Sequence, residues 1–158
     1  MDEKLYKPFC ISVGEIIKEM SDIDVVGMDS LEEERHELTS MGVSSIITFA
    51  GARKGRLLLD MEPGLALSMA GAVLGEEYGD VKDPMVLSLV AEVNNIISGN
   101  AITGINNELL MDLRLAPPVV FAGRDVVISI PRLRSLSSWG ETEYGRIRIN
   151  IAWEGGGS

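Results

Sequence analysis

The stretch VSSIITFAGARKGRLLLDMEPGLALSMAGAVLG, Val43–Gly75, decides the fold class because it predicts two strands and a helix in direct succession. VSSIITFAG and GRLLLDM are apolar, partly β-branched runs bounded by glycines and separated by ARK, a pattern typical of a β-hairpin. EPGLALSMAGAVLG then carries Pro63 in a first-turn position and Gly75 as a C-terminal stop, which indicates a helix. The stretch therefore predicts antiparallel strands followed directly by a helix.

The regions on either side of this stretch extend the same mixture of helices and strands. Pro8–Met20 carries apolar residues at helical spacing, and residues 83–113 form the longest helical candidate. Four short apolar runs follow, PPVVFAG, DVVISIP, RSLSSWG and GRIRINIAW, and each is predicted to be a strand. The expected fold class is α/β, in the α+β sense, with helices packed on one face of a mainly antiparallel β-sheet.

Length and charge limit the organisation and the partners of the chain. Its 158 residues, 46% of them hydrophobic, can bury a core, so we expect a single domain at 1–153 and a flexible tail, EGGGS, at 154–158. The formal net charge is −10 and the 14 Lys and Arg are scattered, which favours neither nucleic acid nor a membrane surface as partner. No apolar leader or run of about 18 apolar residues is present, so a cytoplasmic protein is expected.

Metal and nucleophile chemistry finds little support in the sequence. The single cysteine, Cys10, lies far from the single histidine, His36, so no disulfide, metal site or catalytic triad is expected. His36 lies in the acidic run DSLEEERHELTSMG, where a solvated surface histidine is the expected role. That run fits a helix with a capping box from Ser30 to Glu33, and it also alternates like an exposed strand edge. Both alternatives stay open at this point.

Rotation by 100° per residue separates the longest helical candidate into two faces. Ser88, Glu92, Asn95 and Gly99 fall within one polar stripe, each three or four residues from the next. Asn94 points to the flank of the apolar arc, where we expect it to bond neighbouring backbone. The arc on the opposite side, predicted to be buried, comprises Val86, Val90, Val93, Ile97, Ala101 and Gly104.

The chemistry of the stripe centres on a carboxylate and a carboxamide one turn apart. Glu92 can accept a cation, whereas Asn95 carries a donor and an acceptor and can orient a water molecule. Gly99, one turn further, removes side-chain bulk and would let a partner surface approach closely. Because Glu-x-x-Asn is short and common, spacing alone favours a solvated helix face on which these residues happen to be neighbours.

A longer pattern surrounds the pair. Ser88 is followed by three residues and Glu92, then two residues and Asn95, and Pro118 after a further twenty-two. In this pattern the sequence resembles the chemotaxis phosphatase family that includes CheC and CheX, whose active helix carries an acidic residue or Ser at the first position. The order of elements over about Lys7 to Trp153 is similar to CheX, which implies a single CheX-like domain.

Members similar to CheC carry the motif on two helices, so a second copy is expected on the first helix if the chain is of that type. Laying VGEIIKEM over VAEVNNII pairs Glu15 with Glu92 but Lys18 with Asn95. A lysine has no carboxamide with which to position water, so this second copy should be inactive. A single intact motif makes the chain closer to CheX than to CheC.

The resemblance implies that the chain hydrolyses the phosphoaspartate of a CheY-type response regulator. Glu92 would pair with the regulator's active-site lysine, and Asn95 would hold the attacking water in line with the phosphoryl group. Ser88, Gly99 and Pro118 would flank the docking site. Ser88 could instead bond a carbonyl one turn back, and Pro118 could simply end a loop. The chain would need no cofactor of its own, and Mg²⁺ would be held by the regulator.

The sequence leaves other functions open. A module of the same fold that binds the regulator without catalysis is the main alternative, whereas a metal or small-molecule enzyme would need a convergent set of His, Cys and Asp that is not found. The charge of −10 gives no steering toward an acidic phosphorylation site, which Arg114 or Lys82 could offset locally. A homodimer is a further expectation, because exposed C-terminal strands would allow strand exchange.

Overall fold

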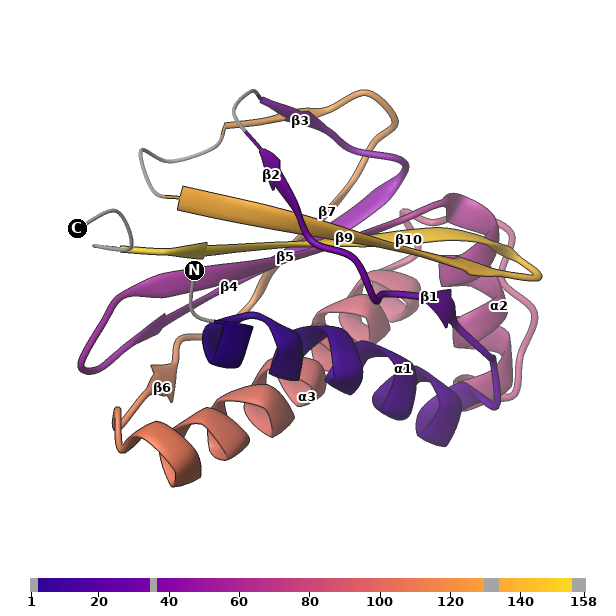
Figure 1. The fold of residues 1–158 in the computed structure, drawn as a ribbon. Helices are drawn as coiled ribbons and strands as arrows, with labels where there is room; N and C mark the ends of the chain where they lie inside the picture. The colour runs from indigo at the N-terminus through magenta and orange to yellow at the C-terminus, as the bar shows by residue number, and fades with distance from the viewer. Residues whose placement is uncertain (1–2, 35–36, 130–133, 155–158) are drawn as a thin grey trace.

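The computed structural model describes residues 3–34, 37–129 and 134–154. In these residues, three α-helices pack against one face of an antiparallel sheet, and Figure 1 shows α1 and α3 below that sheet. The helices are α1 (Lys7–Ser21), α2 (Pro63–Leu74) and α3 (Pro84–Leu109), and a short 3-10 turn at Glu3–Leu5 precedes α1. The three helices predicted from the sequence are therefore confirmed.

The main sheet has the strand order β1-β9-β10-β5-β4-β6, with β2 also paired to β9 and β7 also paired to β4. Its strand pairs are antiparallel, and β3 with β8 forms a separate two-stranded sheet. This arrangement confirms the predicted fold class. The strands are β1 (Val26–Gly27), β2 (Glu32–Glu34), β3 (Leu38–Thr39), β4 (Val43–Ala50), β5 (Gly55–Met61), β6 (Arg114–Leu115), β7 (Val119–Ala122), β8 (Val127–Ile128), β9 (Arg134–Thr142) and β10 (Gly145–Trp153).

The stretch that predicted a hairpin and a helix folds as expected. β4 and β5 pair in register from Val43 opposite Met61 to Phe49 opposite Gly55. α2 has its proline in the first turn, and its backbone leaves the helix through Gly75, whose φ of 78° is the left-handed conformation that glycine adopts without a Cβ clash. The hairpin supplies the central strands on which α3 packs.

The acidic segment that the sequence left undecided forms strands where it is described. β2 pairs with β9, and β3 pairs with β8, so the helix with a capping box from Ser30 is wrong for these residues. The edge-strand alternative is confirmed there. His36 and residues 155–158 of the predicted tail lie outside the described residues.

The C-terminal strands do not have the exposed edges that we expected. β10 lies between β9 and β5, and the other edge of β9 carries β2 at Ser135–Ser137 and β1 at Gly140–Glu141. The expectation of free C-terminal strands is therefore wrong, because two very short strands from the N-terminal half cover that edge. A homodimer stays a prediction without this support.

An aromatic cluster joins the first helix to the sheet. The rings of Phe9 and Phe49 stack with centroids 5.6 Å apart, and those of Phe49 and Trp153 lie 4.8 Å apart. The indole Nε1 of Trp153 donates a hydrogen bond of 2.9 Å to the carbonyl of Leu5. Buried aromatic rings contribute large apolar areas, so this cluster fixes α1, β4 and β10 relative to one another.

The longest helix, α3, packs beside α1 beneath the sheet. By length and composition it is the one helix of the described residues that could cross a membrane, yet half of its most apolar window is buried inside the protein. It packs against β4 on one side and α1 on another. The apolar residues of α3 are thus accounted for by their burial in the core of the protein.

Candidate functional site

The helix α3 begins and ends with clear capping features. Asp83 precedes its first turn, and the Asp83 Oδ1 accepts a hydrogen bond of 2.9 Å from the backbone N–H of Met85. Pro84 occupies the first turn, where a missing N–H has no cost. The chain leaves the helix at Leu110, which has a left-handed φ of 53°. These ends frame a helix whose middle is rich in weak helix formers, so packing must stabilise it.

Asn94 holds α3 against the sheet. Its side chain is fully buried, and its Nδ2 donates to the Ser45 carbonyl at 3.0 Å and to the Ser45 hydroxyl at 3.1 Å. Its Oδ1 accepts a hydrogen bond of 3.1 Å from the Ser98 hydroxyl. The prediction that Asn94 bonds neighbouring backbone is confirmed. Nothing in the sequence identified Ser45 as its partner beyond a small polar residue in an apolar strand.

A second set of polar contacts holds α3 against α1. The Ser12 hydroxyl donates to the Ile97 carbonyl at 2.8 Å, and Asn100 Nδ2 donates to the Ser12 oxygen at 3.1 Å. Directional hydrogen bonds on two sides leave the helix little freedom to rotate. The remaining face of α3 is therefore turned to solvent in a fixed orientation.

That remaining face carries the predicted polar stripe. Ser88 and Glu92 are exposed, while Asn95 and Gly99 are partly exposed. The side chains of Glu92 and Asn95 form no hydrogen bond or ion pair with any other described residue. A carboxylate and a carboxamide thus lie one turn apart, without partners in the described chain, on a helix that is held rigidly from behind.

The buried arc was predicted correctly except at its end. Val86, Val90, Val93, Ile97 and Ala101 are buried, but Gly104 is exposed. A Cβ placed at Gly104 would meet no atom of another element within 4 Å, so this position has open space around it.

The glycine of the stripe has space around it. A Cβ added at Gly99 would lie 3.8 Å from Leu115 Cδ1, which is ordinary van der Waals contact. Glycine costs about 1 kcal/mol relative to alanine inside a helix, so its presence here is unfavourable for folding. The packing of the described chain does not require it, which leaves close approach by an external surface as a reason for it.

Pro118 and Ser88 flank the pair in different ways. Pro118 is partly exposed and directly precedes β7, the strand that pairs with β4 and packs along α3. Val120 of β7 lies opposite Ser45, the residue that binds Asn94. The Ser88 hydroxyl forms no hydrogen bond with a described residue, so the alternative in which it bonds a carbonyl one turn back is not observed.

The first helix does not repeat this arrangement. Glu15 is exposed, but Lys18, at the position that matches Asn95, forms ion pairs with Asp22 at 2.9 Å and with Asp24 at 3.1 Å. The Lys18 ammonium donates hydrogen bonds to Asp22 and Asp24, of which the first has the larger effect, and these bonds raise the pKa of Lys18 above its usual value. Lys18 therefore remains cationic. The carboxamide is therefore replaced on α1 by an ion-paired cation.

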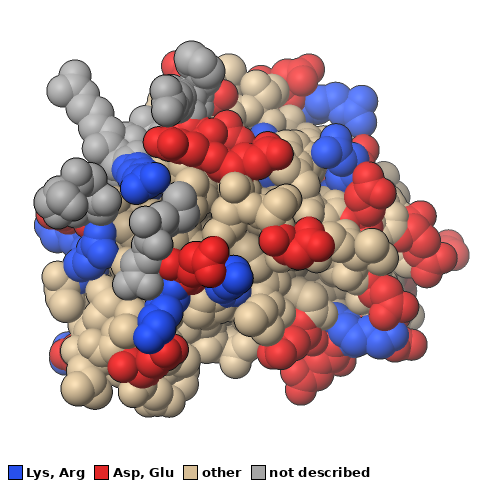
Figure 2. All heavy atoms as spheres, viewed as in Figure 1, with Lys and Arg blue, Asp and Glu red and all other residues tan. Residues whose placement is uncertain are grey.

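Charged side chains of both signs lie on the face of the protein that carries α1. Figure 2 shows acidic and basic groups scattered over the face that carries α1, with no continuous blue patch. Arg114, which follows α3, is exposed and lies 3.4 Å from Asp112, while Lys82, which precedes α3, is also exposed. In the part of the chain that the structure describes, no group of three or more His, Cys, Asp or Glu could hold a metal ion.

Comparison with known proteins places the chain in a class of chemotaxis proteins. The family model for the chemotaxis phosphatase CheX matches residues 43–137, a range that contains all four motif positions. The chain therefore belongs to the CheX family. A comparison with curated proteins gives no match.

Solved structures agree with this assignment. A CheC-like superfamily protein from Shewanella sp. PV-4 has a TM-score of 0.89 at 25% identity, covering 98% of this chain and 100% of that one. CheX from Vibrio vulnificus has a TM-score of 0.86 at 25% identity, with coverages of 97% and 100%. A chain of the CheX–CheY–BeF3–Mg²⁺ complex from Borrelia burgdorferi has a TM-score of 0.75 at 28% identity, with coverages of 94% and 97%.

Proposed function

We propose that this chain is a phosphatase that removes the phosphoryl group from the phosphoaspartate of a CheY-type response regulator in the cytoplasm. The observation that carries the proposal is the placement of Glu92 and Asn95 on the free face of a rigid helix, one turn apart. The membership of the CheX family and the Borrelia complex of a similar chain with CheY support the choice of partner.

The proposed roles of the two residues follow from their functional groups. The Glu92 carboxylate would pair with a lysine of the regulator's active site and so fix the register of the docked complex. The oxygen of the Asn95 carboxamide would then accept a hydrogen bond from a water molecule, and its N–H would face the phosphoryl oxygens. Ser88, Gly99 and Pro118 would border the contact without touching the reacting atoms.

The reaction needs positioning more than covalent chemistry. The water oxygen forms a bond to phosphorus while the bond between phosphorus and the aspartate oxygen breaks. The products are the free aspartate carboxylate and inorganic phosphate, and the proton of the water passes to the phosphate or to solvent. A phosphoryl transfer of this kind is accelerated by orientation and charge stabilisation, which a carboxamide and a docking carboxylate can provide without a nucleophile.

The Mg²⁺ of the proposed complex belongs to the regulator. A hard cation such as Mg²⁺ prefers several oxygen ligands, and the α3 stripe carries a single carboxylate, Glu92, beside the carboxamide of Asn95. Mg²⁺ bound by the partner would supply charge stabilisation at the phosphoryl group. This chain would contribute docking and orientation of water.

The proposal is tested by following the loss of phosphoryl group from a phosphorylated regulator of the same genome. We expect wild-type protein to accelerate the loss, and Asn95→Ala to reduce the acceleration by about 10² to 10³, because one positioning group is removed. Asn107→Ala is a matched control, since Asn107 is an exposed asparagine of the same helix outside the stripe. Equal rates for wild type and Asn95→Ala would contradict the proposal.

The same experiment decides the alternative of a binding module without catalysis. Such a module would bind the phosphorylated regulator and leave its lifetime unchanged at saturating protein. Glu92→Gln adds a separate measurement, because we expect it to weaken binding of the regulator while the rate at saturation changes less than in Asn95→Ala. Binding that does not depend on Glu92 would exclude this helix as the docking surface.

A further inference from the structure

The chain segment that follows α3 is apolar and exposed. Residues 115–123, LAPPVVFAG, include no charged residue and contain β7 and the second residue of β6. Residues 115–120 are all exposed or partly exposed. Among the described residues, β6 and β7 pair with β4 alone, so this segment forms an outer edge of the main sheet. A run of exposed apolar residues is unfavourable unless another surface covers it, which calls for an explanation.

The pairing of this segment with β4 contains one extra residue. β6 ends with Leu115 opposite Phe49, and β7 begins with Val119 opposite Ile46. Residues 116–118 thus lie opposite only two residues of β4, which is a β-bulge. The bulge contains the two adjacent prolines of the segment. Because prolines fix φ and supply no N–H, this edge is stiff and pairs poorly with a further strand.

The bulge turns the side chains on both sides of it toward the helices. Leu115 and Val120 both pack against the main core, although residues five positions apart in a regular strand point to opposite faces. Alternation back from Val120 places Pro118 on the same side. Val119 instead shares the face of Ile46, which packs in the second cluster on the other side of the sheet. Leu115, Pro118 and Val120 together are called the apolar wall below.

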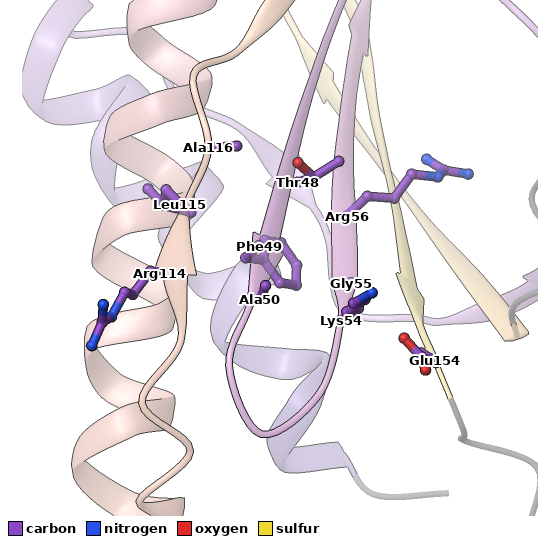
Figure 3. A pocket seen from close by; sticks show the side chains of 10 residues that line it. All are labelled: Thr48, Phe49, Ala50, Lys54, Gly55, Arg56, Arg114, Leu115, Ala116 and Glu154. Atoms are coloured by element: carbon purple, nitrogen blue, oxygen red, sulfur yellow. The ribbon is translucent and has the colours of Figure 1, made fainter.

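The apolar wall borders the polar stripe of α3. A Cβ at Gly99 would lie 3.8 Å from Leu115 Cδ1, and Figure 3 shows Leu115 on the segment that runs beside α3. At the other end of the wall, Val120 lies opposite the residue of β4 that binds Asn94. The wall therefore follows the flank of α3 between Asn94 and Gly99, which is the part of the helix that carries Asn95.

The wall is accessible and uncharged. Leu115 and Ala116 line an open groove of about 610 Å³ together with residues 48–50 of β4, so a further surface can reach this part of the protein (Figure 3). The whole chain has a net charge of −10 and gains no long-range attraction to an acidic phosphorylation site. An uncharged surface beside the stripe adds no repulsion, and burial of its apolar area favours association.

We propose that the apolar wall is a second contact for the phosphorylated response regulator and packs against apolar side chains beside the regulator's phosphorylation site. This inference rests on the proposed function, because it takes the α3 stripe as the surface that the regulator approaches. Glu92 and Asn95 position the reacting groups, whereas the wall contributes affinity through buried apolar area. The bulge and its prolines hold the wall in one conformation before binding, which reduces the entropy lost on association.

The experiment measures binding of the full chain to a CheY-type regulator of the same genome, with beryllium fluoride and Mg²⁺ as a stable substitute for the phosphoryl group. Leu115→Ser and Pro118→Ser each remove apolar area from the wall, so we expect each to raise the Kd by about fivefold or more in calorimetric titration. Val119→Ser is the matched control, because Val119 is 62% exposed in the same segment but lies on the other face of the sheet. Its Kd should stay within about twofold of wild type.

Kinetics with the phosphorylated regulator separate the wall from the reacting groups. We expect both wall variants to raise KM and to leave kcat within about twofold, whereas Asn95→Ala lowers kcat. Leu115 also packs against the core, so urea unfolding checks the stability of Leu115→Ser. Pro118 lies outside the regular strands, so Pro118→Ser keeps the test decisive if Leu115→Ser is unstable.

The outcomes distinguish this inference from the proposed phosphatase activity. Wall variants that bind like wild type, or a Val119→Ser protein that binds as weakly as they do, would overturn the wall as a contact even if the chain is an active phosphatase. Weaker binding of the wall variants to a regulator whose dephosphorylation the wild-type chain does not accelerate would support the wall and refute the phosphatase. A wild-type chain that does not bind the regulator would refute both.

Discussion

The carboxamide of Asn94 donates to the carbonyl of Ser45 at 3.0 Å, and this bond links the centre of α3 to the sheet. The adjacent residue, Asn95, points away by about 100° and has no partner among the described residues. Two asparagines in sequence therefore have opposite environments: one is fully buried and satisfied, and the other faces solvent. The orientation of the second depends on the contacts of the first.

This relationship predicts that substitutions of the two asparagines change the free energy of unfolding by very different amounts. Asn94→Ala should lower the free energy of unfolding by about 2 to 3 kcal/mol, because it leaves buried groups of Ser45 and Ser98 without partners. Asn95→Ala should change that free energy by less than about 0.5 kcal/mol, since the side chain forms no hydrogen bond or ion pair with a described residue. Urea unfolding measures both. If Asn95→Ala proves as destabilising as Asn94→Ala, the assignment of the two faces is wrong.

Substitution of Gly99 can separate an effect on phosphatase activity from an effect on stability, with Gly104 as the matched control. Alanine fits at both positions, and each substitution should raise the free energy of unfolding by up to about 1 kcal/mol through helix propensity. Only Gly99→Ala adds bulk to the stripe, so only this variant should slow dephosphorylation of the regulator. The measurement pairs urea unfolding with the phosphatase assay. A Gly99→Ala protein that is more stable and fully active would show that no surface approaches there.

The sequence determined those features that depend on local periodicity and turn residues. The β4–β5 hairpin, the start of α2 at Pro63 and the two faces of α3 all follow from spacing within one element. Features that depend on pairing between distant strands were not accessible. β1 and β2 have two and three residues, too few for a periodic pattern, yet they cover the edge of β9.

The same limit applies to individual contacts. Ser45 and Asn94 are separated by 49 residues, and Asp60 and Arg148 by 88, so only the fold brings each pair together. Sequence spacing found Glu92 and Asn95 because one helix carries both. It could not tell that Arg148 has the carboxylate of Asp60 beside it.

Two buried arginines have different partners: Arg148 pairs with the carboxylate of Asp60 at 2.6 Å, whereas Arg56 Nη2 donates to the neutral Asn150 Oδ1 at 2.9 Å. The same substitution should therefore have unequal effects at the two positions. Arg148→Met should lower the free energy of unfolding by about 3 to 5 kcal/mol, because it leaves the carboxylate of Asp60 buried without its cation. Arg56→Met should lower it less, by about 1 to 3 kcal/mol, because it leaves the neutral Oδ1 of Asn150 buried without its donor but leaves no anion unpaired. Urea unfolding provides both values. Equal losses would indicate that Arg56 has a counter-charge of its own.

Two buried groups at the start of α1, the thiol of Cys10 and the hydroxyl of the preceding Tyr6, predict a loss of stability in alkali. Burial raises the pKa of the Cys10 thiol and of the Tyr6 hydroxyl above their usual values, so the folded state holds these protons more tightly than the unfolded state. The stabilisation is fully present below the unfolded pKa values, near 9 and 10, and is lost as pH rises through the higher folded values. Unfolding free energies measured from pH 7 to 11 should therefore fall above about pH 9. Cys10→Ala should make the fall less steep, whereas substitution of the exposed Tyr144 by Phe should leave it unchanged. A constant free energy across this range would show that neither group is deprotonated more easily in the unfolded chain.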